Sequence, residues 1–385
     1  MGAQLFNGKV IKQLMSDEVN YIFDKRNGTH ATWGATPEED ATHSPYGPFI
    51  LDMEVGTVCH GPATGPCSFC YKGNTPRGEY MSFETFKAIF DKVPQVLTQV
   101  AFGIGDVDGV PDLWRMFDYC RNNDHNPGVV PNVTVNGARL TDEIVAKLAH
   151  HCGAVAVSLY DEDSCFDAVE RISKAGIKQT NIHAVLCEET YDRCRDVVEK
   201  AATDPRLKGH LRAIVFLTLK PKGPRNSFTT IKDVSKYRAL VERAMELDVG
   251  VGFDSCSAPT FLASIKGDPK FEQIAELAES CESTKFSFYC NVEGKFFPCS
   301  FTEGEPGFEG IDVLAATDFL KDVWNHPETV GFRERLLNQG ESKVHKSCQL
   351  CPMFALYDPD VVGCAEGAKP CPGGSPITFV ERSAP

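Results

Sequence analysis

Three cysteines lie close together in the sequence, at Cys59, Cys67 and Cys70. Thiolates are ligands for zinc ions and for iron–sulfur clusters. Three thiolates leave a tetrahedral site one ligand short, and a cubane cluster held by three thiolates keeps one iron open. Residues 48–58 are apolar and prone to form a strand, so the cysteines are expected on the loop that leaves the C-terminal end of that strand.

A zinc ion is the alternative occupant of this loop, with His60 as its fourth ligand. Cys59 and His60 are adjacent in the chain, so binding both to one tetrahedral ion would strain the backbone. The spacing therefore favours a cluster whose open iron can bind a substrate or a cofactor.

A second group of cysteines lies near the C-terminus. Cys281 and Cys299 flank Gly294, and a Cys-x2-Cys pair, Cys348 and Cys351, begins after 48 further residues. Four thiolates close the coordination of a zinc ion or of an iron–sulfur cluster equally well. The second group therefore suits electron transfer or structural support rather than substrate binding.

The other cysteines are less easily assigned. Cys256 could be a further cluster ligand, a thiol that faces the substrate, or a buried core residue. The roles of Cys290, Cys364 and Cys371 stay open. Five cysteines lie within predicted helices and strands and are interpreted as core residues: Cys120, Cys152, Cys165, Cys187 and Cys194.

The elements that must position these residues alternate regularly along the chain. Six apolar segments, each followed by an amphipathic helix, predict an α/β fold with a parallel sheet. Polar and glycine residues recur just after most of the strands, which favours a partial (β/α)6 barrel of the TIM type over a doubly wound sheet. The predicted strands are residues 48–58, 98–104, 130–135, 154–159, 178–187 and 212–219, and the predicted helices are residues 82–93, 111–123, 141–151, 164–175, 190–202 and 232–248.

The segments on either side of this alternation differ from it. A helix is expected near residues 10–23, and a last short strand at residues 249–253. Further on, residues 281–301 predict a β-hairpin that turns at Gly294, and a helix is expected within residues 313–338. The predicted domains are an N-terminal extension (1–46), the barrel (47–255) and a small α+β domain (256–385).

Composition narrows the classes of partner. The chain has 39 Lys and Arg against 53 Asp and Glu, a net charge of -14, which argues against intact nucleic acid as a partner. Neither a signal peptide nor an apolar run of about 18 residues is present, so a cytoplasmic protein without a membrane segment is expected. In that compartment the 16 cysteines would stay reduced, which favours metal binding over disulfides.

Residues 48–254 resemble the radical S-adenosylmethionine (radical SAM) enzymes. In that family three cysteines after the first strand, commonly spaced Cys-x3-Cys-x2-Cys with an aromatic residue before the last, hold a [4Fe-4S] cluster. Here Phe69 is the aromatic residue, and the gap between Cys59 and Cys67 is longer than usual. The resemblance implies that SAM binds the open iron.

The resemblance extends to the ends of the later strands. Gly103, Gly105 and Asp106 are similar to the family's GGEP motif, which binds the SAM ammonium group, although an ordinary turn is the alternative. Further SAM contacts are implied at Asn136, at Ser158, and at His183, which could instead be a core residue; Lys220 could contact an anion or be solvated.

The C-terminal cysteines resemble the auxiliary-cluster domain called twitch, a short form of SPASM. This implies that Cys281, Cys299, Cys348 and Cys351 hold an auxiliary [4Fe-4S] cluster, with zinc as the alternative. The expected enzyme cleaves SAM to a 5'-deoxyadenosyl radical that abstracts hydrogen from a small molecule or a peptide. A flavodoxin-type reductase is the expected electron donor. The alternative is a metal-binding regulatory protein without catalysis.

Overall fold

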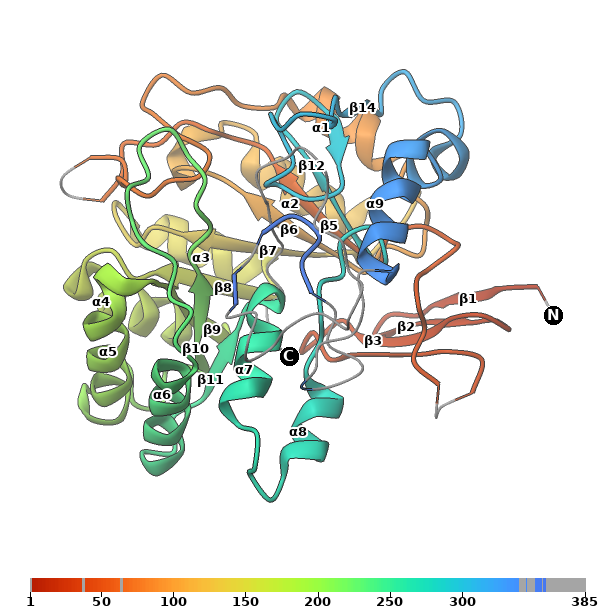
Figure 1. Cartoon of the computed structure of the whole chain (residues 1–385). Helices are drawn as coiled ribbons and strands as arrows, with labels where there is room; N and C mark the ends of the chain where they lie inside the picture. The colour runs from red at the N-terminus through yellow and green to blue at the C-terminus, as the bar shows by residue number, and fades with distance from the viewer. Residues whose placement is uncertain are drawn as a thin grey trace.

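The computed structural model describes residues 2–36, 39–62, 65–338, 344, 350–354, 356 and 357 of the 385-residue chain. In this part of the chain, one large sheet has the strand order β11-β10-β9-β8-β7-β6-β5-β12-β13-β14 (Figure 1). The strands that run parallel in chain order are β5 (Ile50–Glu54), β6 (Gln99–Gly103), β7 (Val130–Val135), β8 (Ala154–Ser158), β9 (Gln179–Leu186), β10 (Ala213–Thr218) and β11 (Val251–Phe253).

A helix follows each strand from β5 to β10, so the predicted alternation is confirmed. Because neighbouring strands are parallel, the loops that follow them meet at one edge of the sheet. The helices are α1 (Phe83–Phe90), α2 (Leu113–Asn122), α3 (Asp142–His151), α4 (Glu162–Lys174), α5 (Tyr191–Thr203) and α6 (Val234–Glu246).

Helix α4 illustrates why these segments are helical and how they pack. Asp161 caps its N-terminus by accepting a hydrogen bond of 2.9 Å from the backbone N–H of Ser164. Its buried residues Cys165, Val169 and Ile172 are spaced four and three apart, which places them on one face. That face packs on the sheet, and Figure 1 shows α4 on its outer side.

The sheet continues across the domain boundary predicted at residue 256. Strand β12 (Ser287–Cys290) pairs in parallel with β5, and β13 (Lys295–Phe297) and β14 (Ile311–Asp312) follow in antiparallel order. The hairpin turns at Gly294, whose φ of +83° suits glycine, as the sequence predicts. The C-terminal strands are therefore joined to the parallel strands by backbone hydrogen bonds.

Short helical segments complete this part of the fold. The helix predicted within residues 313–338 is present as a π-helical turn and α9, whereas α7 and α8 were not predicted. These segments are α7 (Ala258–Ser264), α8 (Phe271–Leu277), η4 (Leu320–Trp324) and α9 (Pro327–Asn338), with 3-10 turns η1 (Val107–Gly109), η2 (Glu188–Thr190) and η3 (Ser255–Ser257).

The N-terminal segment is an antiparallel sheet, so the helix predicted near residues 10–23 is wrong. Tyr21 and Phe23 are buried while Ile22 between them is exposed, which is the period of two of a strand. Gly28, with a φ of +75°, allows the tight turn into the last strand. The strands, in sheet order, are β1 (Gln4–Asn7), β2 (Ile11–Met15), β3 (Asn20–Asp24) and β4 (His30–Trp33).

Two buried polar side chains fasten this sheet to the main domain. The Nζ of Lys12 donates hydrogen bonds to the backbone oxygen of Leu97 at 2.6 Å and to Oδ1 of Asn126 at 2.7 Å. The hydroxyl of Tyr21 donates to the backbone oxygen of Val96 at 2.9 Å. Both acceptor carbonyls precede β6, so the N-terminal sheet packs near the entrance of that strand and away from the loops that follow the strands.

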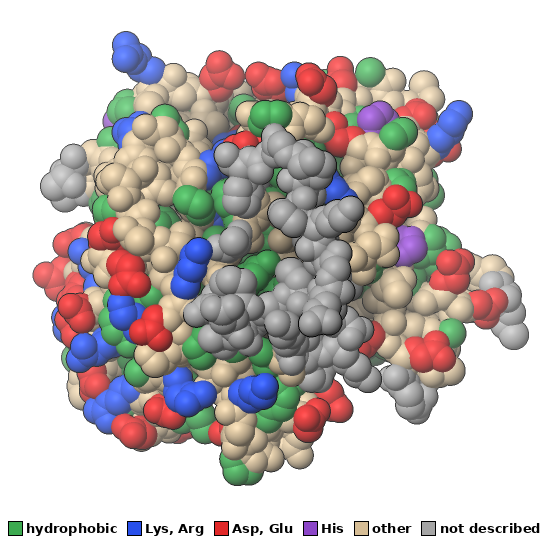
Figure 2. Space-filling model, viewed as in Figure 1, with side chains coloured by type: hydrophobic (Ala, Val, Ile, Leu, Met, Phe, Trp, Pro, Cys, Tyr) green, Lys and Arg blue, Asp and Glu red, His purple; other side chains and the backbone are tan. Residues whose placement is uncertain are grey.

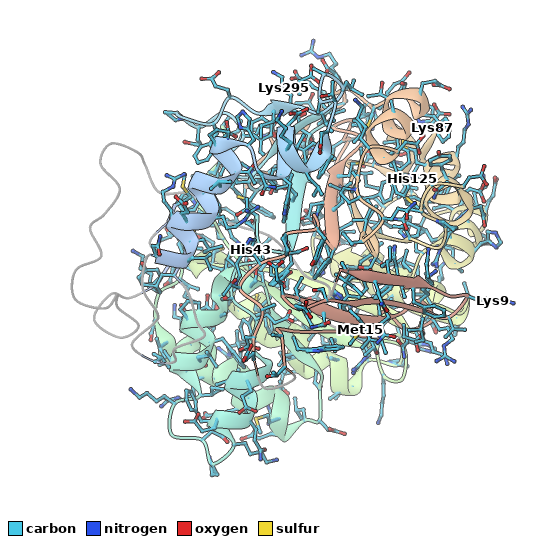
Figure 3. All side chains as sticks on the ribbon, turned by 90° about the vertical axis from the view of Figure 1, so that its right-hand side faces the viewer. Lys9, Met15, His43, Lys87, His125 and Lys295 are labelled. Carbon is cyan, nitrogen blue, oxygen red and sulfur yellow. The ribbon has the colours of Figure 1, made fainter. Side chains whose placement is uncertain are left out.

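The surface carries charges of both signs. On the face in Figure 2, acidic and basic side chains are interspersed. The side view in Figure 3 shows Lys9 extending away from the N-terminal sheet, in contrast to the buried Lys12. In the described segments, the helices are all too short or too polar to span a membrane.

Lys12 should make stability depend on pH. Burial, together with nearby Lys25, lowers the pKa of Lys12 from 10.5 to about 7. Between these values the unfolded chain binds more protons than the folded chain, so the free energy of unfolding rises with pH. Relative to a Lys12→Met variant, the free energy of unfolding of the unmodified chain should rise by roughly 3 to 4 kcal/mol between about pH 7 and about pH 10, as measured by denaturant unfolding.

Lys9→Met is the matched control, because Lys9 is exposed, and its pH dependence should follow that of the unmodified chain. If the free energy of unfolding of all three chains changed with pH in the same way, Lys12 would not be held in the buried position described above.

Candidate functional site

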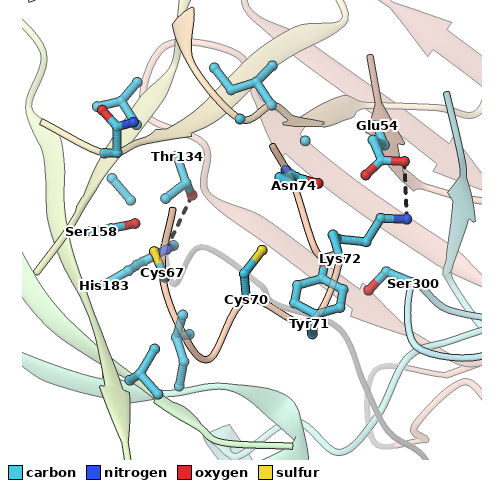
Figure 4. Close-up of a pocket in the computed structure, with 18 of the residues that line it drawn as sticks. Glu54, Cys67, Cys70, Tyr71, Lys72, Asn74, Thr134, Ser158, His183 and Ser300 are labelled. Atoms are coloured by element: carbon cyan, nitrogen blue, oxygen red, sulfur yellow. Dashed lines mark hydrogen bonds and ion pairs between the residues drawn. The ribbon is translucent and has the colours of Figure 1, made fainter. Parts of the chain in front are cut away.

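A cavity of about 350 Å³ opens where the loops after the parallel strands meet. Residues of every strand from β5 to β10 line it, together with the cysteine loop and the hairpin β12–β13. The three cysteines Cys59, Cys67 and Cys70 all line it, and none of them is in a disulfide. Figure 4 shows Cys67 and Cys70 beside the ends of neighbouring strands.

The start of the cysteine loop is fixed by backbone hydrogen bonds to the end of β6. The N–H of Gly105 donates to the carbonyl of Gly56 at 3.0 Å, and the N–H of Asp106 donates to the carbonyl of Val58 at 2.9 Å. A side chain at Gly105 would collide with the Val58 carbonyl and with Cβ of Cys59. Glycine is therefore required here for the close approach that places the first thiol.

The other end of the loop has a similar contact with the segment after β10. Gly223 has a φ of +110°, and a Cβ at this position would come too close to the backbone of Cys70 and Tyr71. From the same segment, Lys222 donates to the backbone oxygens of Phe301 at 2.8 Å and Glu303 at 2.6 Å. The segment thus holds the cysteine loop and the C-terminal hairpin together.

Asp106 contacts the cysteine loop. Its carboxylate is buried behind the loop, outside the cavity lining. It accepts hydrogen bonds from the backbone N–H of His60 at 2.6 Å and from Nδ2 of Asn136 at 2.6 Å, and it pairs with Arg139 at 2.6 Å. Burial would raise its pKa, but these donors outweigh burial and hold the pKa of Asp106 below its ordinary value. The Asp106 carboxylate therefore fixes the start of the cysteine loop, and its contact with a cofactor stays a prediction.

His60 is likewise directed away from the cavity. Its Nδ1 lies 2.9 Å from the Asp106 carboxylate, its side chain is 58% exposed, and it is absent from the cavity lining. The zinc alternative that uses His60 as a fourth ligand beside Cys59 is therefore not supported by the geometry.

Most of the other predicted contact residues are brought together in the cavity. His183 on β9 is buried, and its Nδ1 lies 3.2 Å from Oγ1 of Thr134 on β7. Phe69 packs against Tyr160 and Phe228, with ring centroids 5.8 and 5.2 Å away. The predicted residues that line the cavity are Phe69, Gly103, Gly105, Asn136, Ser158, His183 and Lys220.

Lys220 is not a solvated loop residue. Its ammonium is buried and forms an ion pair with Asp254 at the end of β11, and both residues line the cavity. Ser257 donates a hydrogen bond to the same carboxylate and also contacts the hydroxyl of Thr218. The wall on this side is therefore a buried polar network rather than an apolar surface.

The predicted auxiliary cysteines differ in how far they are buried. Cys281 and Cys299 are buried, and Cys351 is partly buried. Cys290 is buried within β12. Cys348, Cys364 and Cys371 lie outside the described residues.

The comparisons with known proteins were made on sequence and on structure. No family model and no curated protein matches the sequence. Among solved structures, SuiB of Streptococcus suis bound to S-adenosylmethionine superposes with a TM-score of 0.61 at 12% identity, over 90% of this chain and 93% of that chain. The protein anSMEcpe with bound AdoMet gives 0.58 at 13% identity, over 82% of this chain and 90% of that chain. With the Cp18Cys peptide also bound, anSMEcpe superposes with a TM-score of 0.54 at 13% identity, over 81% of this chain and 92% of that chain.

These neighbours were solved with bound S-adenosylmethionine. The chain shares their fold.

Within this fold lies a charged cluster that the sequence did not reveal. Lys72, two residues after Cys70, donates to the hydroxyl of Tyr289 at 2.8 Å and pairs with Glu54 at 3.1 Å and with Glu303 (Figure 4). Tyr289 lies 3.1 Å from Glu54 and 3.2 Å from Glu303. The members of this cluster come from β5, the cysteine loop and the hairpin region, and two that contact each other, Glu54 and Tyr289, are 235 residues apart in sequence.

The pKa values of the two carboxylates of this cluster are shifted in opposite directions. Burial raises the pKa of Glu54, and Glu303 adds to the rise, although Lys72 opposes it. For Glu303, burial also acts to raise the pKa, but Lys72 and the hydrogen bonds from Asn291 and Tyr289 lower it overall. Lys72 therefore offsets the charge of both carboxylates. The neighbouring residue Tyr71 stacks on Phe301, with ring centroids 4.2 Å apart.

Removing the Lys72 ammonium should destabilise the fold. A Lys72→Met variant would leave two buried carboxylates without their cation, at a cost of about 3 kcal/mol in the free energy of unfolding at neutral pH. The pKa of Glu54 is already raised, so in the variant the folded state binds more protons than the unfolded state as the pH falls. The deficit should therefore shrink toward about pH 5.

Lys87→Met provides the control, because Lys87 forms an exposed pair with Asp91, and this variant should lower the free energy of unfolding far less than Lys72→Met. The buried cluster would be contradicted if both variants lowered the free energy of unfolding equally, or if the loss in Lys72→Met did not change with pH.

Proposed function

We propose that the chain is a radical SAM enzyme, with a [4Fe-4S] cluster held by Cys59, Cys67 and Cys70 and with SAM at its open iron. The observation that carries the proposal is the convergence of these three thiols on one cavity at the strand ends of a radical SAM fold. Such a cluster, when bound and reduced, supplies the electron that cleaves SAM to methionine and a 5'-deoxyadenosyl radical, which abstracts hydrogen from the substrate.

The donor set fits a cluster better than a single ion. Burial raises the pKa of Cys59 to about 11 and also raises the pKa of Cys67, and each of these thiols is close enough to Cys70 for its charge to contribute. Yet in the described segments no three His, Cys, Asp or Glu side chains are arranged to hold one metal ion. Zinc needs all its sulfurs about 2.3 Å from one point, whereas cubane ligands bind separate irons.

The cavity also suits a cofactor of the size and polarity of SAM. The backbone at Gly103 and Gly105 borders the loop, the Asn136 side chain is fixed by Asp106, and Ser158 faces the same space. These groups would orient the polar parts of SAM, while Phe69 supplies an apolar surface. Orientation and exclusion of water are the protein's part in this chemistry.

We further infer that the sheet curves around the cavity as a partial (β/α)6 barrel. Side chains from β5, β6, β7, β8, β9 and β10 line the same cavity, which requires a concave sheet. The contacts of Lys222 with the hairpin would close the mouth. The barrel (47–255) and the C-terminal domain (256–385) would then share the continuous sheet and enclose the substrate between them.

An auxiliary centre is proposed in the C-terminal domain. The sequence assigns it to Cys281, Cys299, Cys348 and Cys351, and three of these lie in the described residues, two of them fully buried. A [4Fe-4S] cluster there would accept an electron from the substrate; zinc would brace the fold.

The substrate is a peptide or a small molecule, and a peptide is favoured because anSMEcpe, which shares the fold, was solved with bound Cp18Cys and Kp18Cys peptides. In the reducing cytoplasm expected from the sequence, a flavodoxin-type reductase would supply the electron for SAM cleavage.

Anaerobic incubation with SAM and dithionite tests the proposal. The reconstituted chain should form 5'-deoxyadenosine, and a Cys67→Ala variant should lose at least about 100-fold of this rate, because the cluster loses a ligand. Cys120→Ala, a substitution in the apolar core, should keep the rate within about threefold. A chain that keeps its iron but forms no 5'-deoxyadenosine would refute radical chemistry, and a chain that binds only zinc would support the regulatory alternative.

A further inference from the structure

Glu54 is a buried carboxylate in the cavity wall, and only one of its two oxygens has a partner. It is the last residue of β5, lines the cavity and is 5% exposed. Its Oε2 accepts a hydrogen bond from the Tyr289 hydroxyl at 3.1 Å and lies 3.1 Å from the Lys72 ammonium. Among the residues that the structure describes, Oε1 has neither a hydrogen bond nor an ion pair. Figure 4 shows this oxygen directed away from Lys72, so it is available to a donor in the cavity.

Glu303, the second carboxylate of the cluster, has partners on both oxygens. Its Oε2 pairs with Lys72 and accepts from the Tyr289 hydroxyl at 3.2 Å, and its Oε1 accepts from Nδ2 of Asn291 at 2.7 Å. Lys72 therefore faces two carboxylates with a single positive charge. Buried charge is costly unless it is paired. A cation at the free oxygen of Glu54 would complete both the hydrogen bonding and the charge balance.

The described lining of the cavity does not supply this cation. Its acidic residues are Asp52, Glu54 and Asp254, and its Lys and Arg residues are Lys72 and Lys220. Lys220 forms an ion pair with Asp254 and so does not balance Glu54. The excess of carboxylates over ammonium groups favours a bound molecule that carries a positive charge.

The position of Glu54 separates it from the residues proposed to contact the nucleoside part of SAM. Figure 4 shows Glu54 and Lys72 on one side of Cys70, and Ser158 and His183 on the other side. The side with Ser158 is the one proposed for SAM. The side with Glu54 is then open to the substrate, across the cysteine loop from that cofactor contact.

We propose that Glu54 binds a primary ammonium group of the substrate through its free oxygen Oε1. This inference rests on the proposed function and deepens it, because it assigns a positively charged amine to the substrate. The amine belongs either to a lysine side chain of a peptide or to a small aliphatic amine. A hydrogen bond from an ammonium to a carboxylate is stronger than one between neutral groups, so Glu54 would fix the orientation of the substrate in the cavity.

The test measures binding to the anaerobically reconstituted chain, saturated with SAM and without a reductant, so that SAM is not cleaved. The amine probe is Nα-acetyl-lysine N-methylamide, and the reference is the norleucine analogue, which lacks only the amino group. In equilibrium dialysis the lysine probe should bind at least about tenfold more tightly than the norleucine probe, because it alone can pair with Glu54. Equal affinities of the two probes would overturn the proposal.

Two variants of Glu54 assign the preference for the lysine probe to its charge. Glu54→Gln keeps the size of the side chain but not its charge, and should reduce the preference to less than about twofold. Glu54→Asp keeps the charge and should retain a preference of at least about threefold. Glu143→Gln is the matched control, because the Glu143 side chain is 75% exposed on α3, and its preference should equal that of the unmodified chain.

A Glu54→Gln chain that keeps the full preference would overturn the assignment to Glu54. Cooperative unfolding of each variant is checked first. The comparison of the two probes in the unmodified chain needs no variant, so it tests the proposal even where Glu54→Gln does not fold.

Three further measurements separate the possible sources of the ammonium group. n-Pentylamine carries the same group without peptide bonds: affinity equal to that of the lysine probe would identify a small amine, and weaker binding would identify a peptide. Glu54→Gln could instead weaken the binding of SAM itself while the two probes bind alike, and Glu54 would then hold the ammonium of SAM, which overturns the proposal. A chain that prefers the lysine probe but forms no 5'-deoxyadenosine with dithionite would refute the radical function and keep the amine site.

Discussion

The close approach of three backbone segments at the cysteine loop is the constraint on which the rest of the site depends. Gly105 packs against Val58 at one end of the loop, and Gly223 packs against Cys70 at the other. Neither contact leaves room for a side chain, so the strand ends of β6 and β10 fix the positions of the thiols. The buried carboxylate of Asp106 adds a third restraint through the backbone N–H of His60.

Buried charges extend this restraint to the C-terminal domain. Lys72 joins the cysteine loop to Glu54 on β5 and to Glu303 beside the hairpin, and Lys220 joins the end of β10 to Asp254 after β11. A buried ion is costly unless it is paired, so each pair ties its segments into one arrangement. Together with the parallel pairing of β12 with β5, they make the cavity wall a single structure built from both halves of the chain.

The sequence predicted much of this architecture because the alternation of parallel strands and helices is repetitive. Apolar strands and amphipathic helices alternate from β5 to β10, and local periodicity suffices to find them. The helix predicted near residues 10–23 is wrong because a turn at Ser16–Val19, in which the Ser16 hydroxyl donates to the Val19 carbonyl, divides this segment into the paired strands β2 and β3. The positions of Asp106 and Lys72 could not be read from the sequence, since their partners are 46 residues (His60) and 231 residues (Glu303) away and only folding brings them together. The cysteine spacing identified the three thiols of the loop, but only folding places Cys256, Cys299 and Cys351 in the same hydrophobic cluster.

The central claim is that the three thiols of the loop hold a cluster with one open iron that binds SAM. The most direct test is the Mössbauer spectrum of the chain reconstituted with isotopically enriched iron, recorded before and after addition of SAM. One iron site should change its signal when SAM binds, while the irons held by Cys59, Cys67 and Cys70 keep theirs. A cluster spectrum that SAM leaves unchanged would contradict the claim.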